Sequence, residues 1–243
     1  MKETLRLDKY LCDMGVGTRS EVKKYLKKGQ VTVNGTITKS PDVKIYLAKD
    51  KIQLEGKELK YQRYEYYMLN KPAGVVSATK DNVNQTVIEL ITTSDKRDLF
   101  PVGRLDKDTE GLLLITNDGA LAHQLLSPRN KVKKTYYAKV KGQVNNKDVE
   151  SFLKGIPLEK DFITSPGELK ILESGEISHV KVTITEGKFH QIKRMFHYVS
   201  KEVIYLKRLS IGPLMLDKNL KNGEYRPLTK EEVLMLKNRI HKN

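Results

Sequence analysis

A short loop before a buried segment holds the side chains with the clearest chemical potential, one arginine and three carboxylates. They are Arg104, Asp106, Asp108 and Glu110. The apolar run at 112–116 follows directly and reads as a buried strand bounded by turn formers. Carboxylates beside such a strand are costly to desolvate, so we expect at least one to be paired or to do chemistry. Asp106 is the candidate, because Leu105 can anchor the loop while Arg104 keeps the carboxylate ionised.

An ionised carboxylate in this loop is suited to act as a nucleophile. In a second interpretation, Asp106 and Asp108 are the acid and base of a hydrolase, which requires carboxyls about 5 to 9.5 Å apart and an acid of raised pKa. Arg104 and Lys107 would lower that pKa, which disfavours hydrolysis. In a third, the loop is a solvated turn with a structural ion pair.

A helix predicted over residues 188–199 is the element most suited to bring a cation to this loop. Its apolar side carries Ile192, Met195, Phe196 and Val199. At about 100° per residue, Lys193 falls at the boundary of this side, where its stem can lie on the core while its ammonium reaches a neighbouring site. The opposite side carries His190, Arg194 and His197. The two histidines lie two turns, about 10 Å, apart, so we expect no metal site there.

The larger part of the chain predicts an α+β fold with a mixed, mainly antiparallel sheet, because strands and helices follow one another irregularly. We expect strands at 64–69, 112–116, 135–140, 177–185, 203–206 and 214–216, and further helices at 120–126, at 148–153 and after Thr229. Tyr136 and Tyr137 then point to opposite faces of one strand. No phosphate-loop or dinucleotide glycine pattern occurs, which argues against an ATP-driven enzyme.

The first sixty residues predict a separate small domain, 1–60, before a larger one, 61–243. Thr18 and Glu21 form a capping box for a short helix, and Asn34-Gly35 indicates a two-residue hairpin turn. The exposed face of the helix is basic. It carries Arg19, Lys23, Lys24, Lys27 and Lys28.

The composition favours a polyanionic partner. With 45 Lys and Arg against 30 Asp and Glu, the 243 residues carry a formal net charge of +15, and nucleic acid is the commonest such partner. No apolar run is long enough to span a membrane, and the first residues do not form a signal-peptide core. The single cysteine, Cys12, excludes an intramolecular disulfide and fits the reducing cytoplasm.

Two resemblances sharpen these expectations. The segment 5–59, with Arg6 to Leu11, Thr18-Arg19-Ser20 and Val31 to Gly35, resembles the S4-type RNA-binding module. Five later pieces are similar to the bacterial ribosomal RNA pseudouridine synthases of the RsuA family. They are Asn70 to Val75, Gly103 to Leu113, Lys134-Thr135-Tyr136, Gly187 to Met195, and a tail with Ile211-Gly212 and Gly223 to Thr229.

The second resemblance implies roles for particular residues. Asp106 would be the catalytic aspartate, Tyr136 would stack on the target uracil and help to deprotonate it, and Lys193 would lie near the aspartate. Arg104 and Arg194 would contact RNA, as would the basic face of the N-terminal helix. The reaction requires neither metal nor cofactor.

The resemblance also implies a partner. It would be ribosomal RNA or a partly assembled small-subunit particle. We expect a monomer, because the sequence shows no heptad repeat and no large exposed apolar stripe. A chain with the N-terminal module that stops shortly after its last helix favours uridine 516 of 16S rRNA. A large-subunit 23S rRNA enzyme of the same family, and a non-catalytic RNA-binding or ribosome-assembly protein, remain as alternatives.

Overall fold

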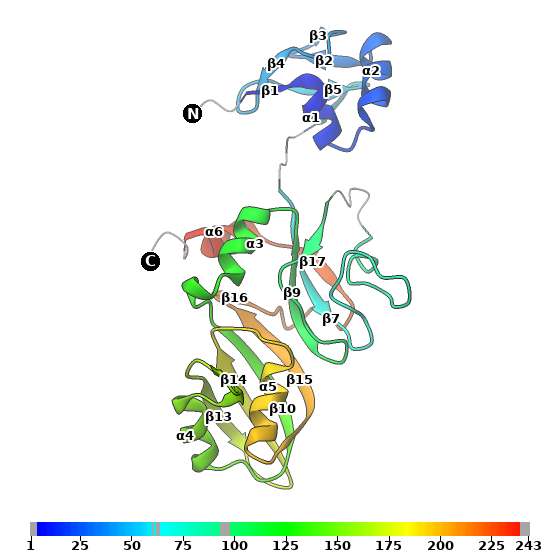
Figure 1. Ribbon diagram of the computed structural model, residues 1–243. Helices are drawn as coiled ribbons and strands as arrows, with labels where there is room; N and C mark the ends of the chain where they lie inside the picture. Colours follow the sequence, from blue (N-terminus) through cyan, green and yellow to red (C-terminus); the bar gives the residue numbers. More distant parts are fainter. Residues whose placement is uncertain (1–3, 60, 62–63, 93–97, 239–243) are drawn as a thin grey trace. The chain divides into compact units, whose positions relative to one another are not determined.

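The computed structural model describes residues 4–59, 61, 64–92 and 98–238, and divides into two compact units (Figure 1). The first unit comprises Met1–Tyr64 and the second Glu65–Asn243. Residue 60, where the sequence placed the boundary, lies outside the described residues. None of the described helices is long and apolar enough to cross a membrane.

The N-terminal unit packs two short helices against small sheets. The helices are α1 (Leu7–Asp13) and α2 (Arg19–Lys27). The strands are β1 (Thr4–Arg6) paired with β4 (Lys44–Tyr46), and a four-stranded sheet of β3 (Thr36–Ile37), β2 (Val31–Val33), β5 (Ile52–Leu54) and β6 (Lys57–Leu59) in that order. The capping box at Thr18 and Glu21 is present, and Asn34 and Gly35 both have positive φ, as the predicted hairpin turn requires.

The second unit is built on one mixed sheet, as predicted. Its order is β13-β14-β10-β15-β9-β7-β17, with β16 beside β15 and β8 beside β9. The strands are β7 (Tyr66–Lys71), β8 (Phe100–Pro101), β9 (Glu110–Thr116), β10 (Lys134–Lys141), β13 (Glu168–Glu173), β14 (Ile177–Ile184), β15 (Glu202–Ile211), β16 (Leu214–Met215) and β17 (Tyr225–Pro227). A small hairpin joins β11 (Pro157–Glu159) to β12 (Phe162–Ile163). Strands β8, β13 and β17 and the β11–β12 hairpin were not predicted from the sequence pattern.

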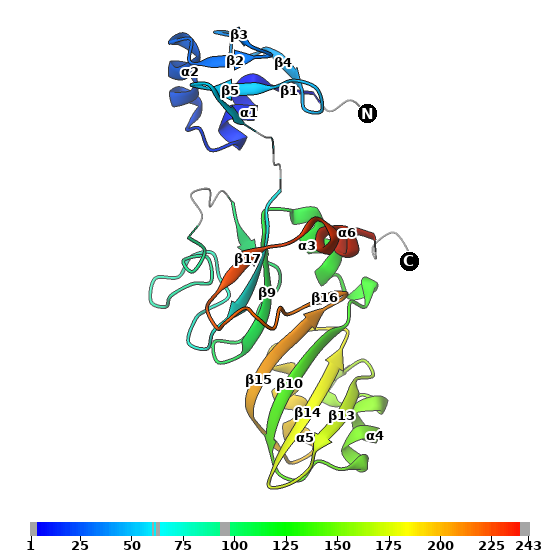
Figure 2. The same cartoon turned by 180° about the vertical axis from the view of Figure 1, so that it is seen from behind.

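Helices cover the sheet in two places (Figures 1 and 2). They are α3 (Gly119–Leu126), a short 3₁₀ turn (Pro128–Asn130), α4 (Asn146–Lys154), α5 (Gln191–Tyr198) and α6 (Lys230–Asn238). Side chains of α4 and α5, such as Phe152 and Phe196, share one apolar core with Leu113. Side chains of α3 and α6 share a second core with Leu112. Strand β9 is therefore buried on both faces, which explains its unbroken apolar run.

A single parallel pairing joins the two halves of this sheet. Glu110 and Gly111 of β9 lie opposite Lys207 and Arg208 of β15, whereas the other paired strands are antiparallel. Gly111 has φ +100°, and a Cβ there would lie 2.3 Å from the carbonyl oxygen of Arg208. Only glycine permits this close approach. The pairing brings the loop that precedes β9 to the region of β15 and its neighbour β10.

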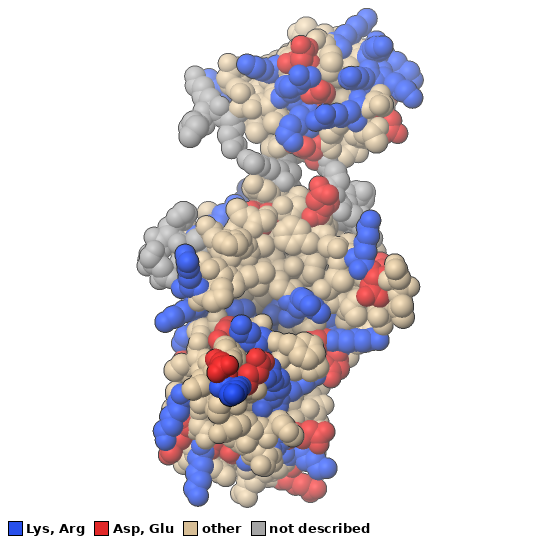
Figure 3. Space-filling model, in the orientation of Figure 1, with Lys and Arg blue, Asp and Glu red and all other residues tan. Residues whose placement is uncertain are grey.

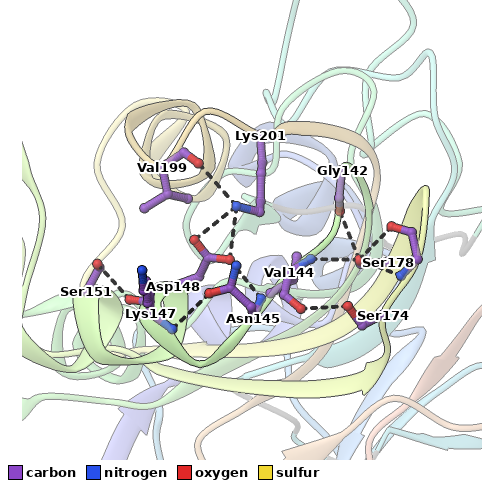
Figure 4. Close-up of polar contacts among 11 residues, drawn as sticks. Gly142, Val144, Asn145, Lys147, Asp148, Ser151, Ser174, Ser178, Val199 and Lys201 are labelled. Carbon is purple, nitrogen blue, oxygen red and sulfur yellow. Dashed lines mark hydrogen bonds and ion pairs between the residues drawn. The ribbon is translucent and has the colours of Figure 1, made fainter.

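A buried ion pair fixes the far end of α5 (Figure 4). Lys201 Nζ lies 3.0 Å from carboxylate oxygens of Asp148, and it also donates to the carbonyl of Val199. Asp148 in turn accepts from the backbone N–H of Asn145, in the capping box that starts α4. The pair therefore ties the start of α4 to the end of α5, the helix that carries Lys193.

A second cluster of charges attaches α6 to β17, and its contribution to the free energy of unfolding can be measured. Arg226 donates to Asp217 at 2.7 Å and to both carboxylate oxygens of Glu232 at 2.8 Å. Replacing Arg226 with methionine should lower the free energy of unfolding of this unit by about 2 kcal/mol, because a partly buried bidentate pair is lost. Chemical denaturation at pH 7 measures this change. Lys133→Met, which breaks an exposed pair with Glu168, should cost under about 0.5 kcal/mol.

The effect of Arg226→Met should depend on pH in one direction. The hydrogen bond from Arg226 holds the pKa of Glu232 below its ordinary value. Its stabilisation is therefore complete above the ordinary pKa of 4.5 and is lost as the pH falls through the lowered value. The difference between the wild type and the variant should shrink in acid, and an unchanged difference at pH 3 would refute this account.

Candidate active site

Asp106 lies in the loop between β8 and β9, at the edge of a hollow in the second unit. Leu105 beside it is buried, as predicted. The Asp106 side chain is 27% exposed, with Oδ2 3.6 Å from Lys193 Nζ and Oδ1 3.7 Å from His190 Nε2. The predicted partner Arg104 forms no ion pair with the described carboxylates, so that part of the sequence interpretation was wrong. The basic side chains beside Asp106, Lys193 and His190, come instead from the segment around α5.

Lys193 divides its charge between two aspartates. Its Nζ lies 2.7 Å from each carboxylate oxygen of Asp108, closer than to Asp106. This hydrogen bond holds the pKa of Asp108 below its ordinary value. A general acid requires a raised pKa, so the pairing disfavours the hydrolase interpretation of Asp106 and Asp108. The pairing with Asp108 also holds the Lys193 ammonium near Asp106, although the two do not form a direct hydrogen bond.

Tyr136 closes the floor of the same hollow. It stands on β10, is 7% exposed and packs in the core with Ile192, while no hydrogen bond joins its hydroxyl to another residue in the described part of the chain. Tyr137 points to the other face of the sheet, where its hydroxyl contacts His179. The hollow is lined by Arg104, Leu105, Asp106, Thr109, Tyr136, Ile184, Gly187, Lys188, His190, Gln191, Ile192, Lys193 and Leu206. A carboxylate, a cation and an aromatic ring thus meet around one small cavity.

Lys71, to which the sequence analysis gave no role, supports the aspartate loop from below. Its side chain is fully buried at the end of β7. The ammonium lies within 2.9–3.2 Å of the carbonyl oxygens of Pro72, Asp106, Lys107 and Thr109. Burial lowers its pKa to about 8, which leaves it mainly protonated at neutral pH. One buried cation therefore holds three carbonyls of the loop that presents Asp106.

His190 was placed wrongly by the helical pattern. Helix α5 begins at Gln191, and His190 is its N-cap residue with φ 49° in the left-handed region. The predicted helix over 188–199 is therefore shorter at its start. Because the backbone turns at this residue, the imidazole faces Asp106 and does not lie on the polar side of a helix. A positive φ at a residue other than glycine is often found at functional sites.

Three comparisons with known proteins agree with this geometry. A family model described as RNA pseudouridylate synthase matches residues 65–198, and a model described as S4 domain matches residues 5–45. The chain belongs to the RNA pseudouridine synthase family. Its N-terminal unit is an S4 domain.

Relatives of this family align with nearly the whole chain. The chain is 46% identical to a Bacillus subtilis protein named uncharacterized RNA pseudouridine synthase YtzG, over 96% of this chain and 98% of the relative. It is 41% identical to the ribosomal small subunit pseudouridine synthase A of Vibrio cholerae, over 94% and 98% respectively. A solved structure titled as a pseudouridylate synthase is 37% identical, with a TM-score of 0.67 and coverage of 96% and 99%.

The two arginines predicted to contact RNA lie in different surroundings in this synthase. Arg104 is exposed at the rim of the hollow. Arg194 is half-buried, and its Nη2 donates to the carbonyl of Leu158 at 2.7 Å and to Glu159 at 3.1 Å. The hydrogen bonds of Arg194 thus attach α5 to the β11–β12 hairpin. An RNA contact by either arginine stays a prediction.

The basic face predicted for the synthase's S4 domain is exposed in the structure. Arg19, Lys23, Lys24, Lys27 and Lys28 are exposed on α2, while its opposite side buries Val22 and Leu26. Figure 3 shows blue side chains gathered over this helix. The capping box and apolar spacing had indicated both faces from the sequence.

The sequence contained weaker indications that Lys71 and His190 belong to the active site. Lys71 lies within the segment Asn70 to Val75 that resembles the family, and His190 lies beside the apolar side of the predicted helix.

Proposed function

We propose that this protein isomerises one uridine of ribosomal RNA to pseudouridine, and that its target is uridine 516 of 16S rRNA. The observation that carries the reaction is the meeting of Asp106, Lys193 and Tyr136 around one hollow. The choice of RNA draws on relatives about 40% identical over nearly their full length, which are named for the small ribosomal subunit.

Asp106 is the nucleophile in this proposal. The isomerisation breaks the bond between ribose carbon one and uracil nitrogen one, joins the ribose to carbon five, and exchanges the proton on carbon five for one on nitrogen one. No electrons are gained or lost, so the chemistry needs no cofactor or metal. The carboxylate attacks either the ribose anomeric carbon or uracil carbon six. Lys193 Nζ, 3.6 Å from Asp106 Oδ2, places a positive charge beside the attacking carboxylate.

Tyr136 receives the uracil in this scheme. A uridine must leave its stack to reach Asp106, which costs a few kcal/mol. Stacking on an aromatic side chain returns about 1 to 3 kcal/mol per base. The unpartnered hydroxyl is then free to help remove the proton from carbon five.

Two substitutions of Tyr136 should separate these contributions. Tyr136→Leu should lower kcat/KM by about 10- to 100-fold beyond the effect of Tyr136→Phe, because the stacking face is lost as well as the hydroxyl. Tyr136→Phe should keep RNA affinity within about threefold and lower turnover by about 10²- to 10⁴-fold, the size of a general base contribution. Tritium release from carbon five and equilibrium RNA binding measure the two effects. Unchanged turnover in Tyr136→Phe would show that a group other than the Tyr136 hydroxyl removes the proton from carbon five.

The S4 domain supplies affinity in this proposal. The five cations of α2 contact phosphates of folded RNA, which orients the substrate without reading its sequence. Arg104 contacts RNA at the rim of the active site, and Arg194 contacts it beyond the β11–β12 hairpin. We expect a monomer, because one chain carries all of the proposed reacting groups, and a cytoplasmic location, where ribosomal RNA is assembled.

Mapping of pseudouridine tests the choice of substrate. The purified protein is incubated with 16S rRNA, with 23S rRNA and with partly assembled small subunits. The RNA in each substrate contains no modified nucleotides at the start. A new pseudouridine at position 516 of 16S rRNA is expected, and the same site should be unmodified in cells that lack the protein. Modification confined to 23S rRNA would overturn the small-subunit assignment. No modification in any substrate would favour a binding or assembly role.

A further inference from the structure

An exposed pair of aromatic rings stands beside the proposed nucleophile. Phe189 is 72% exposed, although large apolar side chains are usually covered. Its ring stacks on the imidazole of His190, with centroids 3.8 Å apart and planes inclined by 16°. His190 thus covers one face of Phe189 and leaves the rest of the ring to solvent. The same imidazole lies 3.7 Å from Asp106.

The two rings border a second hollow that lies next to the first. This hollow measures about 730 Å³, within the range of sites that hold small organic ligands. Arg104, Asp106 and His190 line both hollows, so the two are adjacent. Its remaining walls are formed by Val76, Ser77, Ala78, Asp81, Gly103, Leu105, Lys107, Gly187, Lys188 and Phe189. The space is too large for the target uracil alone and has an aromatic wall of its own.

The charges around this second hollow suit a nucleic-acid strand. Three cations, Arg104, Lys107 and Lys188, line it together with the two carboxylates Asp81 and Asp106. Arg104 and Lys188 are exposed, and neither forms an ion pair with the described carboxylates. Aromatic rings beside cations are the arrangement by which proteins bind unpaired bases and their phosphates.

We propose that Phe189 and His190 form a stacking platform for the base of a second unpaired nucleotide, adjacent to the target uridine in the RNA strand. A base on the open face of Phe189 is separated from the imidazole by one ring, and the imidazole contacts Asp106 through Nε2. At about 3.4 Å per stacking interval, the base lies about 7 Å from the imidazole, a spacing that fits the next nucleotide. The inference rests on the proposed function and specifies how the strand beside the target is held.

The backbone at His190 fits this role. A left-handed φ at a residue other than glycine is energetically unfavourable and persists only where the surroundings enforce it. Here it turns the imidazole toward both Asp106 and Phe189. A regular helix from residue 188 would separate these rings from the carboxylate.

The test combines one change in the protein with one in the RNA. The protein change is Phe189→Ala, in an exposed loop where folding should be unaffected. The RNA change is an abasic nucleotide on the 5′ or the 3′ side of the target uridine, in a short substrate that the wild type modifies. The readouts are kcat/KM for tritium release and equilibrium binding of the same RNA. Tyr198→Ala, at the exposed end of α5, is the matched control and should change either value less than twofold.

The platform predicts coupling between the two changes. Phe189→Ala on intact RNA, and the abasic nucleotide at one of the two sides with wild-type protein, should each lower kcat/KM by about 5- to 150-fold. Together they should cost no more than either alone. An effect of Phe189→Ala under twofold on the short RNA would overturn the platform. So would losses from the protein change and the RNA change that multiply when the two are combined. Absence of pseudouridine with wild-type protein and intact RNA would instead reject the proposed function, and binding would still test the platform.

Discussion

Replacing Asp106 with asparagine should abolish pseudouridine formation while leaving the fold and the RNA affinity in place. The asparagine amide has nearly the same shape but is neutral and cannot form the covalent bond to ribose or uracil. Loss of a nucleophile typically costs several orders of magnitude, so we expect turnover to fall by about 10⁴-fold or more. Tritium release from carbon five measures turnover, and equilibrium binding should stay within a few fold.

The matched control for this change is Asp161→Asn. Asp161 is an exposed aspartate in the turn between β11 and β12 that lines neither hollow, so its substitution removes the same charge from a residue outside them. It should leave turnover within about twofold. If Asp106→Asn retained a tenth of the activity, Asp106 could not be the nucleophile. If Asp106→Asn lowered RNA affinity and turnover equally, the role of Asp106 would be to bind RNA and not to catalyse the reaction.

Replacing Lys71 with methionine should damage both stability and activity. Four carbonyl oxygens would lose a buried donor, three of them in the loop that carries Asp106. Buried acceptors left without a partner cost about 1 to 3 kcal/mol each before relaxation, so we expect a loss of about 3 kcal/mol in unfolding free energy. In a unit of this size that corresponds to a fall in Tm of roughly 6 to 12 °C. Displacement of the carboxylate by about 1 Å should lower kcat by about 100-fold.

Lys134 offers a close control for Lys71. It too is a buried lysine whose pKa burial lowers to about 8, but within the described part of the chain its ammonium donates to a single carbonyl, that of Val132, at 3.2 Å. Lys134→Met should therefore cost less than about 1 kcal/mol in unfolding free energy. Scanning calorimetry of both variants checks the contrast. Equal destabilisation would show that loss of any buried lysine, and not the four shared carbonyls, sets the effect.

The fold could be predicted where local chemistry repeats. The capping box at Thr18, the helix after Thr229, the Asn34-Gly35 turn and the apolar run of β9 all appear where the sequence indicated them. Strands β13 and β17 were missed, because β13 alternates weakly and β17 has only three residues. Such strands are stabilised by their neighbours in the sheet and not by their own composition.

The candidate site was predicted unevenly for a similar reason. Asp106 and Lys193 were suggested by charge beside apolar segments, and Tyr136 by resemblance to the family. Asp108 was considered as one of a hydrolase pair and not as the partner of Lys193, which lies far from it in the sequence. His190 looked like the polar side of a helix. Lys71 looked like a strand end, although four carbonyls from two segments converge on it. Convergence of distant backbone groups leaves no local pattern.

The sequence by itself determined the kind of chemistry available. An acidic loop before a buried strand, a lysine at the edge of a helix and a strong positive charge follow from residue type and spacing alone. Only the tertiary structure decided which groups meet. The parallel pairing of β9 with β15, possible because Gly111 has no side chain, sets the Asp106 loop beside Tyr136 and α5. The physical reason is that spacing along the chain constrains neighbours within one element, whereas contacts between elements depend on how a whole sheet packs.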